Sequence, residues 1–326
     1  MKALVFEAPE RAVVAELEPP SIGPDEVLVR SHTVGICHSD FELYAGRYII
    51  PVEYPIIPGH EWAGEVAEVG SGVTDLKPGD RVVGECVVGP GGRDHFGFSI
   101  SGANAEYFRA RAEWLHVLPD ELSYTGGALV EPFSVAYNAT HSAGGVDPSD
   151  DVAVIGGGPI GLLCVAAAAA HNATVTLVEP QSARREKGLE LGARAALDPT
   201  AGDFADAVAE VTRGRGFDVV LEAAGAPGAM ASALEIAGHS ARLVFVGIDI
   251  GSTATAKLGL IQSKALRITG IIGSAGLWPQ TIRFLASGVV DPSAIVTARF
   301  PLESALDALD AAQDTARNVK VHIETA

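Results

Sequence analysis

Residues 152–170 read VAVIGGGPIGLLCVAAAAA, and this stretch decides the fold of the second half of the chain. The apolar run VAVI predicts a buried strand, and IGLLCVAAAAA predicts a buried helix that begins directly after the turn. Between them the glycines match the spacing G-x-G-x-x-G. Glycines at that spacing permit a tight turn, close approach of the backbone to a pyrophosphate, and close packing of helix on strand. Taken alone, the pattern suits a purely structural turn equally well.

The residues that follow the turn favour a dinucleotide site. The run TVTLVE ends at Glu179, 18 residues after Gly161, where a carboxylate accepts hydrogen bonds from ribose hydroxyls. A carboxylate there repels a 2′-phosphate and so favours NAD over NADP. Arg184 and Arg185 could soften that preference, although solvated positions at a helix start suit them better. We expect cofactor contacts from Gly156, Gly158, Pro159, Ile160, Gly161, Glu179 and Arg184.

The chain divides into two parts of different character. From residue 152 onward, apolar strand candidates alternate with helical stretches, which predicts a doubly wound parallel sheet of the Rossmann type. The first 120 residues are short Val-rich segments bounded by turn residues, which predicts a β-rich body almost without helices. A helix is expected over 122–142, before the turn GGVDPSDD. We place the dinucleotide domain at 144–290 and the other domain at 1–143 and 291–326, although the tail could instead extend the sheet.

Composition limits the partners and the location. The net charge is −18 and the pI is about 4.8, so phosphate backbones and anionic membranes would be repelled. The opening MKALVFEAPE lacks the basic and apolar regions of a signal peptide. Three widely spaced cysteines are typical of reduced thiols rather than a disulfide framework. We therefore expect a cytoplasmic protein that binds neither nucleic acid nor membrane.

Two segments in the β-rich part carry metal-binding residue types. Cys37 lies in GICHSD and His60 in IPGHEWAG, each in a loop next to a predicted strand. Neither belongs to a short ligand pair, so spacing leaves a buried thiol and a satisfied loop histidine as likely as two zinc ligands. The segment GHEWAG with the later Gly70 and Val73, together with GICHSD, resembles the zinc signature of medium-chain alcohol dehydrogenases. The segments KPGDRV, GANAEYF, ALVEP and the glycine turn follow in that family's order, so the resemblance spans almost the whole chain.

The resemblance implies a GroES-like catalytic domain beside the Rossmann domain, and one catalytic zinc. ALVEP looks most like the sorbitol and polyol dehydrogenase branch, in which glutamates replace a cysteine ligand. It implies that Cys37, His60 and Glu61 bind zinc, with Glu131 either the fourth ligand or hydrogen-bonded to the zinc water. Asp40 is expected to orient the His60 ring. Glu61 therefore counts among both the metal ligands and the catalytic residues.

Proton transfer is expected to begin at Ser39, whose hydroxyl can both donate and accept. Glu42 stands where many relatives have a second relay histidine, and it either extends the relay or is merely solvated. Lys320 could reach the cofactor or substrate side. Packing or surface roles are favoured for five residues that border the expected cleft: His38, Tyr44, Arg93, His95 and Phe96.

One departure from the family concerns the lobe after the DRV segment. Only Cys86 is present there, which excludes a structural zinc bound by four cysteines. Relatives are dimers or tetramers joined through the cofactor domain, so a homodimer or homotetramer is expected, with LRITGII as a contact.

The function implied is zinc-dependent hydride transfer between NAD(H) and a secondary alcohol or ketone. Polyols, cyclitols or aminocyclitols are expected as substrates, because MKALVFEAPERAV resembles the opening of 2-deoxy-scyllo-inosamine dehydrogenases. Threonine and simple secondary alcohols remain alternatives. Zinc-free quinone reductases share the architecture but lack the Cys, His and Glu set. A non-catalytic dinucleotide-binding protein would be expected to lose those residues first.

Overall fold

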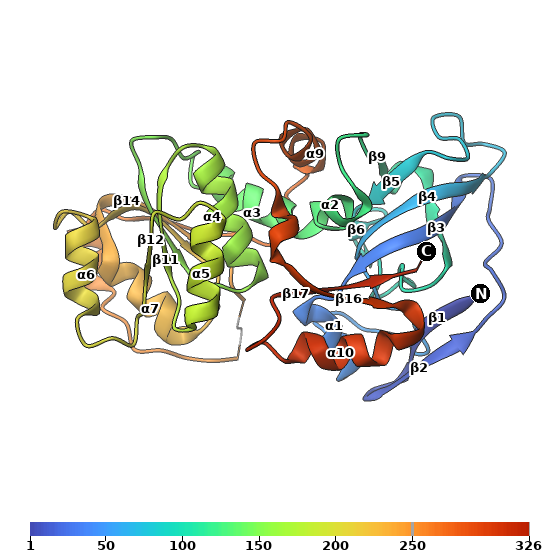
Figure 1. Cartoon of the computed structure of the whole chain (residues 1–326), viewed down its shortest axis with the longest axis horizontal. Helices are drawn as coiled ribbons and strands as arrows, with labels where there is room; N and C mark the ends of the chain where they lie inside the picture. Colours follow the sequence, from blue (N-terminus) through green and yellow to red (C-terminus); the bar gives the residue numbers. More distant parts are fainter. Residues whose placement is uncertain (249–250, 326) are drawn as a thin grey trace. The chain divides into compact units, whose positions relative to one another are not determined.

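The computed structural model describes residues 1–248 and 251–325, and it divides into two compact units (Figure 1). Unit 1 contains Met1–Glu131 and Trp278–Ala326, and unit 2 contains Pro132–Leu277. Both junctions lie before the boundaries that we expected at residues 143 and 291. Helix α3 (Val130–Ser142) runs past the first junction, so the GGVDPSDD turn marks the end of a helix rather than a change of unit.

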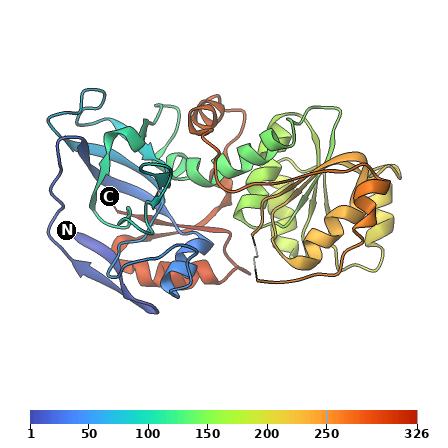
Figure 2. The same cartoon turned by 180° about the vertical axis from the view of Figure 1, so that it is seen from behind.

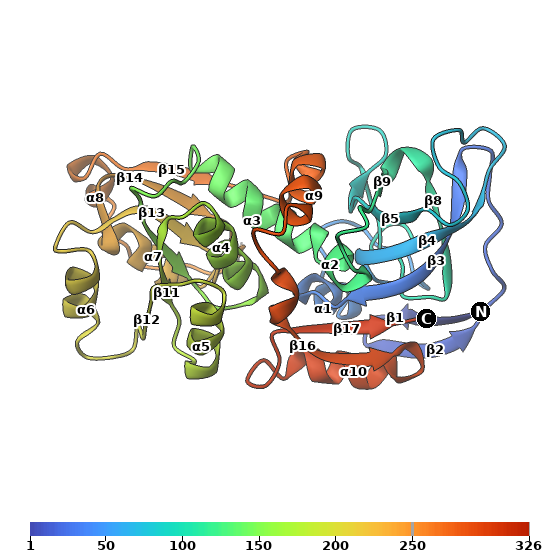
Figure 3. The ribbon, with the colours of Figure 1, turned by 45° about the horizontal axis from the view of Figure 1, so that its top comes forward.

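Unit 2 is built on a parallel sheet whose strand order is β12-β11-β10-β13-β14-β15. The chain begins at β10, moves outward through β11 to β12, and then returns to the other side of β10. This confirms the doubly wound sheet expected from the sequence. Figure 3 labels the other five strands of this sheet, β11 to β15. The strands are β10 (Asp151–Ile155), β11 (Thr174–Val178), β12 (Ala195–Leu197), β13 (Phe217–Glu222), β14 (Ala237–Phe245) and β15 (Arg267–Gly270).

Helices pack against this sheet and bury its central strands. Helix α4 contacts β10, β11 and β13, helix α5 contacts β11 and β12, and helix α7 contacts β13 and β14. Eight consecutive residues of α4, from Gly161 to Ala168, are buried, which explains why its sequence is apolar on every side. The helices are α4 (Pro159–Ala170), α5 (Ser182–Glu190), α6 (Phe204–Val211), α7 (Pro227–Ile236) and α8 (Gly259–Ser263).

Unit 1 contains a sheet of order β16-β17-β3-β4-β5-β9, with β8 also paired to β3. Strand β3 pairs antiparallel with β4 along most of its length, and its other edge is shared by β8 and β17. Two short hairpins, β1–β2 and β6–β7, accompany this sheet. The strands are β1 (Lys2–Ala8), β2 (Arg11–Glu16), β3 (Glu26–Gly35), β4 (Glu61–Val69), β5 (Arg81–Gly84), β6 (Val87–Val88), β7 (Asp94–His95), β8 (Tyr107–Arg111), β9 (Leu115–Val117), β16 (Val296–Pro301) and β17 (Lys320–Glu324).

The helices of unit 1 include one that we did not expect from the sequence. Helix α1 (His38–Tyr44) interrupts the strand-rich region directly after β3, and its short length hides any helical periodicity. The single helix expected over 122–142 is divided into α2 and α3. The remaining helical elements are α2 (Tyr124–Ala128), α9 (Trp278–Ala286), α10 (Ala305–Gln313) and the 3₁₀ turns η1 (Ala112–Trp114), η2 (Pro292–Ile295) and η3 (Leu302–Ser304).

The C-terminal segment belongs to unit 1. Strand β17 pairs with β3, while α10 and η3 contact the N-terminal strands β2 and β1. Figures 1 and 2 show the blue N-terminal hairpin beside the red helix α10 from opposite sides. The tail therefore returns to the first body instead of extending the parallel sheet. Among the described residues, no helix combines the length and apolar character needed to cross a membrane.

Candidate functional site

Three predicted ligands come together in unit 1. Cys37 follows the end of β3, while His60 and Glu61 stand at the start of β4. The antiparallel register of these strands places Gly35 opposite Glu61, which brings the two loops to the same end of the sheet. The Cys37 thiol, a His60 ring nitrogen and a Glu61 carboxylate oxygen all lie within 4.8 Å of one another.

A glycine leaves the space that this cluster needs. A Cβ atom at Gly35 would lie 2.3 Å from Glu61 Oε2, which no real contact permits. The buried carboxylate of Glu61 therefore depends on the absence of a side chain at position 35. This requirement comes from the strand register, and it is not visible in the sequence.

Asp40 links the first two ligand candidates. Its Oδ2 accepts a hydrogen bond of 2.8 Å from the backbone N–H of Cys37, at the first turn of α1. Its Oδ1 lies 3.4 Å from His60 Nδ1, and both side chains are buried. Because Nδ1 faces Asp40, the other ring nitrogen of His60 is the one left to bind a metal.

The electrostatic field at the cluster favours positive charge. Burial lowers the pKa of His60, but the charge of Asp40 and hydrogen bonding to Asp40 and Cys37 outweigh it, so the pKa is raised. The same field would attract a divalent cation. A thiolate, an imidazole and a carboxylate are donors that Zn²⁺ commonly uses. The residues present therefore fit a zinc ion.

Lys320 makes the principal contact to Glu61. Its ammonium donates to Glu61 Oε1 at 2.8 Å and Oε2 at 2.7 Å, and to the carbonyl of Ile36 at 3.1 Å. Both side chains are almost fully buried, with 2% and 1% exposed. Lys320 thus holds the carboxylate of a ligand candidate. No sequence pattern joins these two residues, which lie 259 positions apart.

Glu131 lies near the cluster but outside the group of three. It stands near the start of α3, and burial raises the pKa of its carboxyl to about 7. The pKa also responds to the charges of His60, Glu61, Lys320 and Asp40, so the carboxyl lies within electrostatic range of the cluster.

The two relay candidates occupy one helix. Ser39 lies in the first turn of α1, two residues after Cys37. Glu42 lies in the same helix and forms an ion pair with Arg47, at 2.9 Å between Oε1 and Nη2. Hydrogen bonding to Arg47 lowers the pKa of Glu42. Glu42 is therefore engaged with a surface cation.

A tyrosine and a histidine that the sequence analysis did not connect lie beside the cluster. The Tyr48 hydroxyl is 3.2 Å from His95 Nδ1. The Tyr48 ring stacks on Phe98 with centroids 4.1 Å apart, and Phe98 lies 4.6 Å from the His60 ring. Burial raises the pKa of Tyr48 well above its usual value, and that pKa also responds to Cys86, His60 and Cys37. No pattern of spacing joins residues 48 and 95, because separate loops carry them.

In unit 2, the predicted glycine turn connects β10 to α4. Gly156 has a φ of 97°, and Gly158 is the N-cap of α4 with Pro159 at its first turn. A Cβ atom at Gly161 would lie 1.8 Å from the carbonyl oxygen of Gly156. Gly161 therefore permits the close packing expected of the third glycine, and Ile160 lies beside it in α4.

Glu179 lies at the end of β11 against the glycine turn. Its Oε2 accepts from the Gly157 N–H at 2.6 Å, and its Oε1 accepts from the Gln181 N–H at 2.8 Å. A Cβ atom at Gly157 would lie 3.1 Å from the Cβ of Arg184, so Arg184 also borders the turn. Arg185 instead donates to the Glu179 and Pro180 carbonyls and pairs with Asp198. Carboxylate, glycines and Arg184 thus lie around one helix N-terminus.

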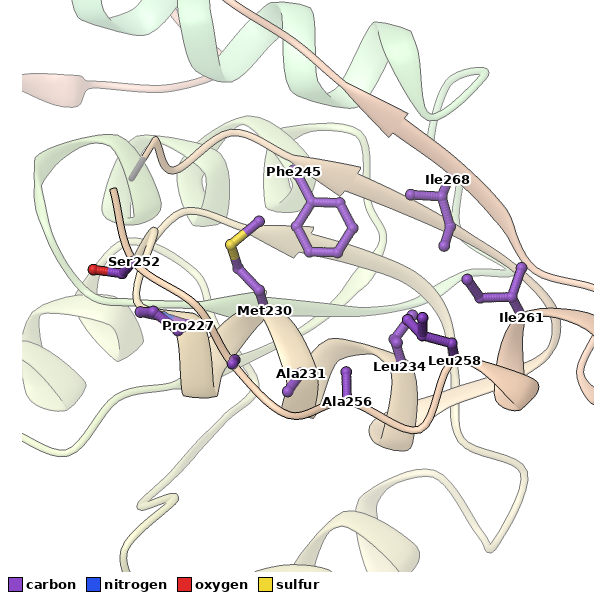
Figure 4. Close-up of a pocket in the computed structure, with 11 residues that line it drawn as sticks. Pro227, Met230, Ala231, Leu234, Phe245, Ser252, Ala256, Leu258, Ile261 and Ile268 are labelled. Carbon is purple, nitrogen blue, oxygen red and sulfur yellow. The ribbon is translucent and has the colours of Figure 1, made fainter. Parts of the chain in front are cut away.

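A separate pocket of about 290 Å³ lies in unit 2 between α7, α8, β14 and β15 (Figure 4). Met230 and Phe245 point into it from opposite elements. Its lining is almost wholly apolar and includes no residue of the two sites above.

Comparison with known proteins identifies the family. The family model "Alcohol dehydrogenase GroES-like domain" matches residues 23–120, and the model "Zinc-binding dehydrogenase" matches residues 159–287. Sorbitol dehydrogenase from Bacillus subtilis is 35% identical over 332 residues, which cover 96% of this chain and 93% of that protein.

Solved structures agree with this result. The crystal structure of 2R,3R-butanediol dehydrogenase from Bacillus subtilis superposes with a TM-score of 0.91 at 33% identity, covering 100% of this chain and 99% of the other. A zinc-binding dehydrogenase from Sinorhizobium meliloti bound to NADP gives a TM-score of 0.92 at 28% identity, covering 99% of each chain. The chain therefore belongs to the medium-chain, zinc-dependent alcohol dehydrogenase family, whose members are oxidoreductases that use zinc and a nicotinamide dinucleotide.

Proposed function

We propose that this protein transfers a hydride between NAD(H) and a secondary alcohol group of a polyhydroxylated substrate. The observation that carries the proposal is the cluster of Cys37, His60 and Glu61, whose ligand atoms lie within 4.8 Å of one another. Cys37 and His60 would hold zinc with a carboxylate from Glu61 or Glu131. A cytoplasmic location would keep the Cys37 thiol reduced and able to bind the metal.

The residues around the cluster have distinct tasks in this reaction. When bound, zinc supplies Lewis acidity to the substrate oxygen, and NAD⁺ supplies the hydride acceptor. Ser39 accepts the proton of the substrate hydroxyl and passes it toward water. Asp40 fixes the orientation of the His60 ring, and Lys320 fixes the carboxylate of Glu61. Glu42 could extend the relay only by giving up its ion pair with Arg47.

The relatives support a polyol as the substrate class. Besides the sorbitol dehydrogenase, they include a D-arabitol-phosphate dehydrogenase from Enterococcus avium, 30% identical over 100% of this chain. The butanediol dehydrogenase acts on a smaller diol, as its name states. Vicinal hydroxyl groups are the feature that sorbitol and butanediol share. We therefore place polyols, cyclitols and aminocyclitols ahead of simple secondary alcohols and threonine.

Zinc analysis tests the metal role directly. Cys37→Ser and His60→Ala should each remove zinc and turnover, while binding of NADH, followed by its fluorescence, remains measurable. Cys164→Ala serves as the matched thiol control, because Cys164 is buried within α4 of unit 2. Normal zinc content in both ligand variants would refute the proposed site.

A substrate screen tests the reaction. The protein purified without chelator should reduce NAD⁺ with members of a panel of polyols, cyclitols and aminocyclitols. Threonine and 2-butanol complete the panel. Zinc-containing protein that reduces NAD⁺ with none of these alcohols, and oxidises NADH with none of the matching ketones, would exclude the proposed activity.

Assembly through the sheet edge of unit 2 is a second proposal. Strand β15 ends the parallel sheet, and all four of its residues are exposed. An exposed edge offers unpaired backbone groups to a second strand. Ile268 is 39% exposed and Ile272 is 78% exposed at this edge. We propose that β15 pairs with its copy in a homodimer or a homotetramer.

Sedimentation tests that proposal. Ile268→Lys should shift the protein toward monomer, while Val289→Lys, an equally drastic change at an exposed site of unit 1, should leave the assembly unchanged. A monomeric wild-type protein would contradict the pairing.

A further inference from the structure

The contact between Tyr48 and His95 joins two loops of unit 1. Tyr48 follows α1, and His95 ends the short strand β7. The hydroxyl oxygen and Nδ1 are 3.2 Å apart, and both residues are half-buried. The backbone N–H of His95 donates to Ser99 Oγ at 2.8 Å, which steadies the loop that carries the ring. The two side chains therefore form a fixed polar group that is partly exposed.

The pair lies next to the candidate metal centre. The Tyr48 ring is stacked almost parallel on Phe98, with 3° between their planes, and the other neighbour of Phe98 is the His60 ring. One aromatic ring thus separates Tyr48 from a ligand candidate. Burial lowers the pKa of His95, against an opposing effect of the Asp94 charge, which favours the neutral imidazole.

Three other polar groups near the centre are already engaged. Glu61 is held by Lys320, Asp40 by the backbone of Cys37, and Glu42 by Arg47. Tyr48 and His95 are bound to each other, and a neutral imidazole and a phenol together keep both donor and acceptor capacity. A phenol that donates to Nδ1 retains lone pairs that can accept from a ligand. The phenol and the imidazole therefore suit a neutral hydroxyl group of a ligand. They carry no charge that would attract a charged ligand group.

We propose that Tyr48 and His95 bind a second hydroxyl group of the substrate, on a carbon near the one that is oxidised. This inference rests on the proposed dehydrogenase function, and it assigns the preference for polyols over simple alcohols to two residues. A polyol satisfies the pair, whereas 2-butanol offers no hydroxyl at that position. An apolar ligand would bury the two side chains without making hydrogen bonds to them, which costs free energy. A site that hydrogen-bonds a hydroxyl group therefore discriminates against ligands that lack this group.

Tyr48→Phe is the sharpest test, because it removes one oxygen and keeps the ring that stacks on Phe98. The ratio of kcat/KM for sorbitol to kcat/KM for 2-butanol should fall about tenfold, the value of one lost hydrogen bond. Tyr44→Phe is the matched control, since the Tyr44 hydroxyl donates to the Glu10 carbonyl at 2.7 Å on the exposed surface. His95→Ala should lower the same ratio as Tyr48→Phe.

A binding measurement separates this inference from turnover. Sorbitol added to the complex with NADH cannot react, because both are reduced, so calorimetry gives its Kd directly. Tyr48→Phe should raise that Kd about tenfold at unchanged zinc content. Equal losses for sorbitol and 2-butanol, or an unchanged Kd, would overturn the assignment. Activity toward 2-butanol with no binding of sorbitol would also overturn it and leave the dehydrogenase function standing.

Discussion

Lys320 and Glu61 form a buried ion pair in which the ammonium contacts both carboxylate oxygens, at 2.8 and 2.7 Å. The two residues are separated by 259 positions in the sequence. One is a candidate zinc ligand, and the other belongs to the last strand, β17. The pair therefore couples the metal centre to the C-terminal segment.

Removal of the cation should destabilise the protein strongly. Lys320→Met leaves the Glu61 carboxylate buried without its partner, and we expect the free energy of unfolding to fall by about 3–5 kcal/mol. Urea denaturation measures the change. Lys257→Met is the control, because the Lys257–Glu235 pair is exposed and should contribute less than about 1 kcal/mol. A loss no larger than that of the control would show that the carboxylate is solvated.

A methyl group at position 35 should disturb the same carboxylate. Gly35→Ala places a Cβ atom 2.3 Å from Glu61 Oε2, so the strand or the carboxylate must move. We expect a loss of about 1–3 kcal/mol in stability and weaker zinc binding, followed by titration with a chelator. Gly228→Ala, in α7 with open space around it, should be neutral or slightly stabilising. Similar behaviour of the two variants would contradict the packing argument.

Cofactor choice should depend on Glu179. Glu179→Gln removes the charge that repels a 2′-phosphate and weakens the hydrogen bonds to ribose hydroxyls. We expect the ratio of kcat/KM for NADP to kcat/KM for NAD to rise about tenfold or more. Glu186→Gln makes the same change of charge at an exposed position of α5 and should leave the ratio unaltered. An unchanged ratio in the first variant would place the selectivity elsewhere.

His322 should make stability fall in mild acid. Its ring is fully buried, and burial lowers its pKa from 6.5 to about 3. The unfolded chain therefore takes up a proton on His322 as the pH falls below about 6.5, while the folded protein does not. The free energy of unfolding consequently decreases as the pH falls toward 3. Between pH 7 and pH 5 the contribution is about 2 kcal/mol.

His322→Leu should remove that part of the pH dependence, as measured by thermal and urea unfolding at both pH values. The substitution should be neutral or stabilising at pH 7, because neither ring nitrogen has a hydrogen-bond partner among the described residues. His141→Gln, at an exposed site, is the control. An identical slope in the leucine variant and the wild type would assign the acid sensitivity to other groups.

The fold of unit 2 could be predicted because its signals are local. The glycine turn, the apolar strands and the acidic end of β11 lie within a short stretch, and alternation of strands and helices fixes a parallel sheet. The β-rich character of unit 1 was also predicted. Helix α1 was missed, because it is too short to show helical periodicity. A local hydrogen bond from the Cys37 N–H to the Asp40 carboxylate stabilises its first turn instead.

The metal centre was predicted from residue types and family resemblance rather than from spacing. Cys37 and His60 come from different loops, and only the pairing of β3 with β4 brings them together. The partner of Glu61 could not be found in the same way, because β17 lies at the other end of the chain. The contact between Tyr48 and His95 was not predicted, for the same physical reason. The two residues lie in separate segments, and their contact depends on tertiary packing.

The position of Lys320 has a consequence for the order in which the protein is made. Synthesis produces residue 61 long before residue 320, so the growing polypeptide carries an acidic group whose final counter-ion does not yet exist. The strand that delivers it, β17, can pair with β3 only after residues 320–324 have emerged from the ribosome. The metal centre therefore gains this counter-ion only after the whole of unit 2 has been synthesised.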